Sequence, residues 1–107
     1  MKHLVFVGPG RIGSAVQPYF DAEKFKITVL SRREYGDFLS ADYAPEAAVQ
    51  SLEACDAVIC FAGLFELNAP AARMRQANCD AITRLAEAVH RRFPCAQVIT
   101  FLDAHIH

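Results

Sequence analysis

The sequence lacks an excess of charge of either sign. It contains 11 Lys and Arg residues against 12 Asp and Glu residues, so its net charge at pH 7 is −1. Proteins that bind nucleic acid or anionic membranes usually carry a basic excess, and we therefore expect neither partner. The sequence also lacks an apolar run of about 18 residues, the length that a membrane-spanning helix needs. Since a strand-like segment follows Met1 directly, without a signal peptide, we expect a cytoplasmic protein.

Cysteines at the spacing of metal ligands are lacking too. The four cysteines, Cys55, Cys60, Cys79 and Cys95, show no CxxC pattern. In a protein without an export signal such residues are typically reduced, and we expect mostly buried thiols. A metal site built from Cys79, His90 and Cys95 is the weaker alternative, because no compact pair of ligands recurs. We therefore expect no metal.

What the sequence does have is a regular alternation of apolar strand segments and amphipathic helix segments. Its 107 residues, 53% of them apolar, suffice for one small domain with a core and leave no room for a second. Alternating strands and helices form a parallel sheet with right-handed crossovers. We predict an α/β fold with a Rossmann-like parallel sheet of about five strands in the order 3-2-1-4-5, flanked by helices. The expected strands are His3–Val7, Lys26–Leu30, a weak Phe38–Ala41, Ala57–Phe61 and Gln97–Leu102.

Three main helices are expected between these strands. The first has apolar residues at the spacing of one helix face, and Pro18 should kink or shorten its last turns. The second begins at Pro45, which suits the first turn of a helix, and ends near Ala54. The third runs from Pro70 or Asn78 to Arg92. The apolar face of the first helix consists of Ile12, Ala15, Val16, Tyr19 and Phe20, and the inner face of the third consists of Ala81, Ile82, Leu85, Ala86 and Val89.

The fifth expected strand, Gln97–Leu102, would lie at an open edge of the sheet. It is apolar, and only five residues follow before the chain stops. Bare apolar edges invite pairing with another chain. We therefore expect a homodimer or a partner chain at this strand-five edge, or a chain that is the front part of a longer protein.

An apolar strand, Val5–Val7, runs directly into a G-x-G-x-x-G motif. A nucleotide pyrophosphate needs such a turn, because its oxygens approach backbone N–H groups closely and a Cβ there would collide with them. Gly8 would make the tight turn, Gly10 would admit the phosphates, and Gly13 would let the helix lie against the strand. The motif predicts a dinucleotide site, and a structural turn that binds nothing is the alternative. Its residues are Gly8, Pro9, Gly10, Arg11, Ile12 and Gly13.

The end of the second expected strand decides between the two nicotinamide cofactors. An acidic residue there would accept a hydrogen bond from the adenosine ribose 2′-hydroxyl and select NAD. This strand ends instead in Ser31, Arg32 and Arg33. A hydroxyl and guanidinium groups suit a 2′-phosphate, so NADP is the expected cofactor and NAD the alternative. The other interpretation of the two arginines is a pair of solvated loop charges.

Three further residues would lie beside a cofactor. Asp42 follows the weak third strand, where its carboxylate could accept a hydrogen bond from the adenine amino group; an exposed loop residue is the alternative. Ala62 and Gly63 follow the fourth expected strand, at the carboxyl end of the sheet where ligands of such folds bind. Glycine there allows close approach to the cofactor ribose, unless it only ends the strand.

These segments together resemble the short-chain dehydrogenase/reductase superfamily, in particular its extended and atypical branches. The resemblance covers essentially the whole chain but only the cofactor half of such an enzyme. It implies that the glycine motif holds the pyrophosphate and that Arg32 and Arg33 hold the 2′-phosphate. It also implies that Asp42 contacts the adenine and that Ala62 and Gly63 contact the nicotinamide-side ribose. The segments that carry the resemblance are FVGPGRIGSAV, VLSRR, SADYAPEAAVQSLEACDAVICFAG, ANCDAITRLAEAV and VITFLD.

The catalytic residues of that superfamily have no counterpart in this sequence. Catalysis there rests on a Tyr-x-x-x-Lys pair, in which the lysine lowers the tyrosine pKa so that the phenol can pass a proton to the substrate carbonyl. No tyrosine of this chain has a lysine four residues later. Where the superfamily has its catalytic Ser or Thr, this chain reads Phe101-Leu102-Asp103, and Val7 stands where its first glycine would be. The catalytic residues therefore stay unknown.

Other candidate chemistry is weaker. Asp103, His105 and His107 could form an acid–base or metal cluster, but a terminal tail is the favoured interpretation. Arg73 and Arg75 could meet an anionic substrate, although a solvated helix face is the default.

Three functions then remain. The first is the cofactor half of an oxidoreductase, whose substrate residues come from a missing C-terminal part or a partner chain. The second is a non-catalytic nucleotide-binding module for regulation or assembly. The third is a scaffold that binds no nucleotide, and the glycine motif followed by two arginines argues against it. If the chain takes part in a reaction, we expect hydride transfer to or from a carbonyl or hydroxyl carbon, with the cofactor supplying the chemistry.

Overall fold

Strands and helices alternate along the chain in the computed structural model, which describes residues 1–36, 41–61, 71–75 and 79–100. No helix in these ranges has the length and apolar character needed to cross a membrane. The strands are β1 (Lys2–Val7), β2 (Phe25–Leu30), β3 (Ala57–Cys60) and β4 (Gln97–Thr100). The helices are α1 (Gly10–Val16), the 3₁₀ helix η1 (Gln17–Tyr19), α2 (Arg32–Tyr35), α3 (Pro45–Gln50), α4 (Ala71–Arg75) and α5 (Ala81–Arg92).

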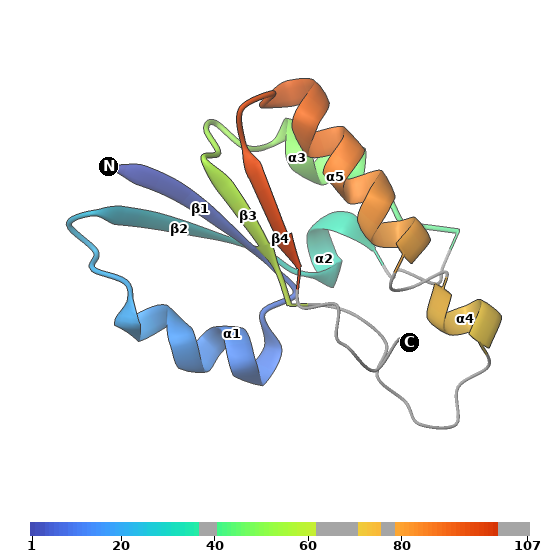
Figure 1. Cartoon of the computed structure of the whole chain (residues 1–107), viewed down its shortest axis with the longest axis horizontal. Coiled ribbons are helices and arrows are strands. Elements are labelled where there is room, and N and C mark those ends of the chain that lie inside the picture. Colours follow the sequence, from blue (N-terminus) through green and yellow to red (C-terminus); the bar gives the residue numbers. More distant parts are fainter. Residues whose placement is uncertain (37–40, 62–70, 76–78, 101–107) are drawn as a thin grey trace.

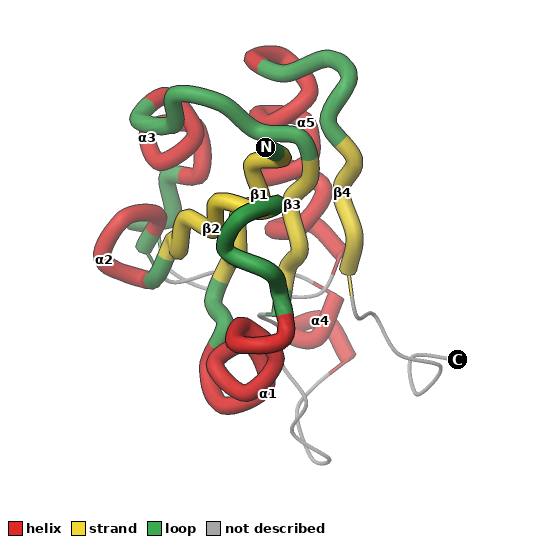
Figure 2. The backbone as a smooth tube through the Cα atoms, turned by 90° about the vertical axis from the view of Figure 1, so that its left-hand side faces the viewer, coloured by secondary structure: helices red, strands yellow, loops and turns green. Residues whose placement is uncertain are grey.

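The four described strands form one parallel sheet in the order β2-β1-β3-β4 (Figure 2). Leu4 to Val7 of the central strand β1 are all buried, as expected for a parallel strand that is covered on both faces. The register aligns Val7 with Leu30 of β2 and with Cys60 of β3. The carboxyl ends of these three strands therefore meet at one edge of the sheet.

The predicted number of strands was wrong, because the described residues form four strands rather than about five. Of the expected weak strand Phe38–Ala41, Ala41 lies in a turn and residues 38–40 lie outside the described residues. Gly36, which has a φ of +83°, lies close to Asp42, because a Cβ on Gly36 would be 2.6 Å from the Asp42 carbonyl oxygen. The order of the other four strands is the predicted one.

One face of the sheet packs against α3 and α5, which Figure 1 shows on the opposite side of the sheet from α1. Val5 and Val58 point to this face, and each is only 1% exposed. α3 begins at Pro45 as predicted, but it ends at Gln50 instead of near Ala54. The predicted inner face of the last helix is confirmed by four buried residues, Ala81, Ile82, Leu85 and Val89, whereas Ala86 is half-buried.

The other face of the sheet is covered differently from the prediction. The apolar stripe of α1 was expected to face the sheet, but Ile12 is 68% exposed and Tyr19 is 89% exposed. The residues that approach the sheet are Gly13, which is buried, and Phe20, whose ring lies 5.6 Å from that of Phe6. Glycine at position 13 allows the helix to approach most closely along its own side, about 100° around the helix axis from Ile12. The side of α1 that packs on the sheet is therefore the side that carries Gly13, and not the side of the predicted apolar stripe.

Two smaller expectations concern proline and cysteine. The helix changes from α to 3₁₀ at Gln17, one residue before Pro18, which confirms the predicted effect of this proline. The thiols are only partly buried: Cys55 and Cys60 lie in the core, whereas Cys79 and Cys95 are exposed. Burial raises the pKa of the Cys55 thiol to about 11.

Candidate functional site

The glycine turn lies between the ends of β2 and β3. Gly8 and Gly10 both have a positive φ, of 56° and 52°, which residues with a Cβ rarely adopt. The amide of Gly8 donates a hydrogen bond to the carbonyl of Leu30 at 2.8 Å, and the amide of Phe61 donates to the carbonyl of Val7 at 2.9 Å. The turn is therefore fastened to both neighbouring strands. In open parallel sheets, ligands bind at this carboxyl edge, where the strand order reverses.

The last two glycines of the motif have different surroundings. Gly10 is exposed, and nothing lies within 4 Å of the position that its Cβ would take. Gly13 is buried, and its Cβ would lie 2.2 Å from the Pro9 Cβ and 3.2 Å from the Phe61 ring. Gly10 thus leaves the backbone open to a ligand, whereas Gly13 has the packing role that the motif predicts. The side chains of Arg11 and Ile12 are exposed beside the turn.

Ser31 follows β2 directly, and its polar atoms are already engaged. Its hydroxyl donates to Oε2 of Glu34 at 2.6 Å, and its backbone amide donates to the same oxygen at 2.7 Å. These two hydrogen bonds lower the pKa of the Glu34 carboxyl. Glu34 thus makes the acidic half of a Ser-x-x-Glu capping box at the start of α2, whereas its own amide donates to the Ser31 carbonyl at 2.9 Å. Glu34 is the residue of this site that sequence reasoning missed, although Ser-x-x-Glu at 31–34 was a readable signal.

The two predicted arginines lie in α2 beside this pair. Arg33 is exposed, its amide lies 3.4 Å from the Ser31 hydroxyl oxygen, and its charge contributes to the lowered pKa of Glu34. Arg32 is the first residue of α2. Since Leu30 accepts a hydrogen bond from Gly8, the Ser31–Arg33 segment begins next to the glycine turn. The structure therefore brings the two predicted parts of the site together.

The remaining predicted site residues are Asp42, Ala62 and Gly63. Asp42 is exposed on the loop that follows α2, where the amide of Ala44 donates to the carbonyl of Tyr35 at 2.7 Å. Ala62 and Gly63 lie outside the described residues, as do Asp103, His105 and His107.

The weaker metal alternative is not supported by the positions of its residues. Cys79 precedes α5, whereas His90 lies in its last turn and Cys95 follows it. His90 follows Cys79 by eleven positions along the helix, which corresponds to roughly 16 Å. No group of three His, Cys, Asp or Glu side chains in the described ranges could hold a metal ion.

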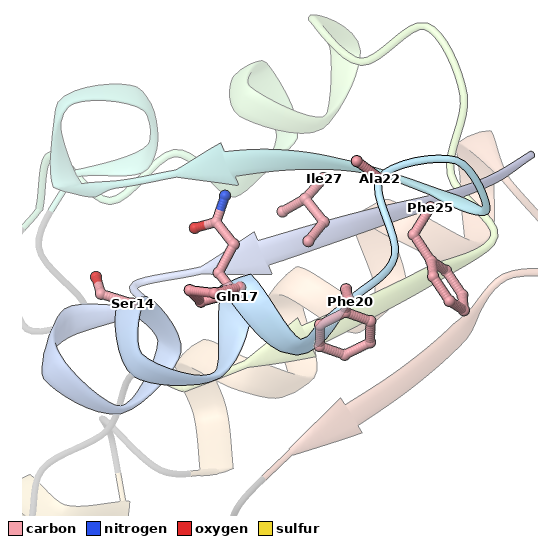
Figure 3. Close-up of a pocket in the computed structure, with 7 residues that line it drawn as sticks. Ser14, Gln17, Phe20, Ala22, Phe25 and Ile27 are labelled. Atoms are coloured by element: carbon pink, nitrogen blue, oxygen red, sulfur yellow. The ribbon is translucent and has the colours of Figure 1, made fainter.

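A cavity of about 490 Å³ lies on the α1 side of the sheet, between η1 and the first half of β2 (Figure 3). Phe20, Phe25 and Ile27 form apolar walls, and Ser14 and Gln17 lie at its rim. None of the predicted site residues lines it. The candidate site is therefore the open turn at the carboxyl edge of the sheet, distinct from this cavity.

Two solved structures share the arrangement of this chain. One is a short-chain dehydrogenase/reductase superfamily protein from Agrobacterium tumefaciens with bound NAD; its TM-score is 0.64 at 17% identity, over 92% of this chain and 31% of that one. The other is RMD from Pseudomonas aeruginosa complexed with NADPH; its TM-score is 0.64 at 25% identity, over 94% of this chain and 34% of that one. The chain folds like the Rossmann part of a short-chain dehydrogenase/reductase. It spans about a third of the length of either protein. No protein-family profile and no curated protein matches the sequence.

Two of the three tyrosines of the sequence are packed in the core. Tyr35 and Tyr43 are 4% and 5% exposed, with their rings packed edge to face at 6.1 Å. The Tyr43 hydroxyl donates to the carbonyl of Ala81 at 2.7 Å, and burial raises its pKa above the usual value. Tyr19 is exposed on η1. The described tyrosines therefore act in packing, or lie away from the candidate site.

Proposed function

We propose that residues 1–107 form a single NAD(P)-binding domain, with NADP preferred, that serves as the cofactor half of a short-chain-type oxidoreductase. The observation that carries the proposal is the glycine turn. Gly10 has a positive φ and open space before it, at the point where the ends of β1, β2 and β3 meet. Backbone N–H groups in such a turn can approach a pyrophosphate without obstruction by side chains. The nicotinamide dinucleotides in both similar structures support the same assignment.

Different groups of the cofactor would lie at different residues around the turn. The pyrophosphate lies at Gly8–Gly13, and the adenosine 2′-phosphate lies at Ser31, Arg32 and Arg33. Asp42 contacts the adenine, and Ala62 with Gly63 contacts the nicotinamide-side ribose. The residues that move protons during hydride transfer come from another part of the protein or from a partner chain, because no Tyr-x-x-x-Lys pair occurs in this sequence.

Calorimetric titration with NADPH and with NADH tests the cofactor assignment. We expect NADPH to bind at least tenfold more tightly, a difference of about 1.4 kcal/mol. Arg33→Ala should weaken NADPH binding and leave NADH binding unchanged, because only NADPH carries the 2′-phosphate. Arg91→Ala removes the same charge from the exposed surface of α5 and is the matched control. Failure of the wild-type chain to bind either cofactor would contradict the assignment.

A second function, as an assembly module, is supported by the edge of the sheet. Among the described strands β4 pairs only with β3, and Ile99 on this strand is 43% exposed. We propose that a second copy or a partner chain pairs at this edge, which corresponds to the predicted strand-five edge.

Sedimentation over a range of protein concentrations tests self-association at this edge. We expect a concentration-dependent dimer that Ile99→Lys weakens, because the variant places a charge within the apolar contact. Gln97→Lys adds the same charge at an exposed polar position of β4 and should change the dimer less. A monomer at all concentrations would leave a partner chain as the remaining form of this proposal.

A further inference from the structure

The Ser31–Glu34 pair places a carboxylate beside the proposed 2′-phosphate position. Glu34 is exposed, and its Oε2 accepts both the Ser31 hydroxyl at 2.6 Å and the Ser31 backbone amide at 2.7 Å. A 2′-phosphate at Ser31 would need these same two donors. In the structure both are directed to an anionic side chain that is open to solvent.

The position of this pair relative to the glycine turn makes it part of the site. Gly8 donates to the carbonyl of Leu30 at 2.8 Å, and Ser31 is the next residue. A nucleotide whose pyrophosphate lies at the turn would extend its adenosine ribose toward the end of β2. Among the side chains that the structure describes, those of Ser31, Arg33 and Glu34 flank this end, so that the negative charge of Glu34 would face the phosphate together with the positive charge of Arg33.

We propose that Glu34 is a specificity-determining residue, whose carboxylate occupies the donors of Ser31 and opposes the 2′-phosphate, so that it narrows the preference for NADPH over NADH. The inference rests on the proposed function. A 2′-phosphate must compete with Glu34 for the hydroxyl and the amide of Ser31, and it meets a like charge near the guanidinium group of Arg33. A 2′-hydroxyl carries no charge and does not meet this repulsion.

The Glu34→Gln substitution tests the effect of the carboxylate charge apart from that of the hydrogen bonds to Ser31. The amide oxygen of glutamine can still accept from Ser31 and keep the capping box, while the negative charge is lost. We expect NADPH affinity to rise about tenfold, equivalent to about 1.4 kcal/mol, and NADH affinity to change less than twofold. The same titrations with 2′,5′-ADP and 5′-AMP isolate the adenosine end of the cofactor and should show the same difference. Glu87→Gln on α5 removes a charge from an exposed position elsewhere and is the matched control.

The outcomes separate this inference from the proposed function. One outcome is that the wild type and the Glu34→Gln variant both bind both cofactors, with the same ratio of NADPH affinity to NADH affinity. In that case Glu34 acts only as a helix cap, and the inference is overturned while the proposed function stands. A loss of NADH affinity alone would make Glu34 a ligand of the 2′-hydroxyl and would overturn the inference as well. If the wild-type chain binds neither cofactor, the proposed function fails and the inference fails with it. Thermal unfolding of each variant shows whether the fold is retained.

Discussion

Replacing Gly13 by alanine should lower the free energy of unfolding by roughly 1–3 kcal/mol, the range of overpacking in a well-packed core. The added Cβ would lie 2.2 Å from the Pro9 Cβ and 3.2 Å from the Phe61 ring. Neither neighbour is the free end of a flexible chain, because proline is a ring and Phe61 is packed on Phe6 at 5.1 Å. The added methyl group therefore fits only if the first turn of α1 distorts at Pro9, its N-cap residue, and the helix shifts away from Phe61. Urea unfolding followed by circular dichroism measures the change.

A loss of stability in Gly13→Ala would be opposite to the usual effect of this substitution in a helix. In an ordinary helix interior, alanine is more favourable than glycine by about 1 kcal/mol. Ser14→Ala, at the exposed neighbouring position of α1, is the matched control and should change stability by less than about 0.5 kcal/mol. A Gly13→Ala variant as stable as the wild type would mean that Gly13 does not pack as tightly against Pro9 and Phe61 as described.

Replacing Gly10 by valine should abolish cofactor binding without unfolding the domain. Gly10 has a φ of +52°, so that the variant carries a backbone strain of about 1–2 kcal/mol or more for a β-branched side chain. The space around its Cβ is empty, and no core contact is disturbed. The side chain would instead occupy the approach to the backbone N–H groups. Calorimetry with NADPH should show an affinity at least 100-fold lower, about 2.8 kcal/mol.

The Gly10→Asn substitution distinguishes two effects of the valine variant, namely the obstruction of the nucleotide by a side chain and the strain of a positive φ. Asparagine adopts a positive φ more readily than other residues with a Cβ, so the turn keeps its conformation while a side chain enters the site. We expect its stability to stay close to that of the wild type and its NADPH affinity to fall as in the valine variant. Unchanged affinity in both variants would mean that the nucleotide binds away from the glycine turn.

Much of this fold was predictable from local sequence. The strand cores are short apolar runs bounded by turn residues, and parallel pairing follows from their alternation with helices. The order of the four described strands agrees with the prediction, since a parallel sheet admits few arrangements with right-handed crossovers. The capping box at Ser31 was equally local. Its signal is the spacing of a serine and a glutamate three residues apart, ahead of a short helix.

The packed face of α1 was not predictable from its apolar pattern. Ile12 and Tyr19 carry the pattern and are exposed, whereas Gly13 and Phe20 make the contact with the sheet. Periodicity identifies an apolar face, but the closest approach of two backbones depends on the absence of a side chain. The close approach of Gly36 to Asp42 is likewise a contact between residues that no periodicity relates.

The sequence by itself determined that the glycine turn stands at the carboxyl edge of a parallel sheet, because a strand, a turn and a helix in succession allow little else. Only the tertiary structure decided what faces that turn. Hydrogen bonds from Gly8 and Phe61 join the turn to the chain at Leu30 and Val7, and these contacts fix its position between β2 and β3. They bring Ser31 and Glu34 to one side of the turn and leave the space before Gly10 open. Contacts between distant segments depend on packing, and packing is a property of the whole fold.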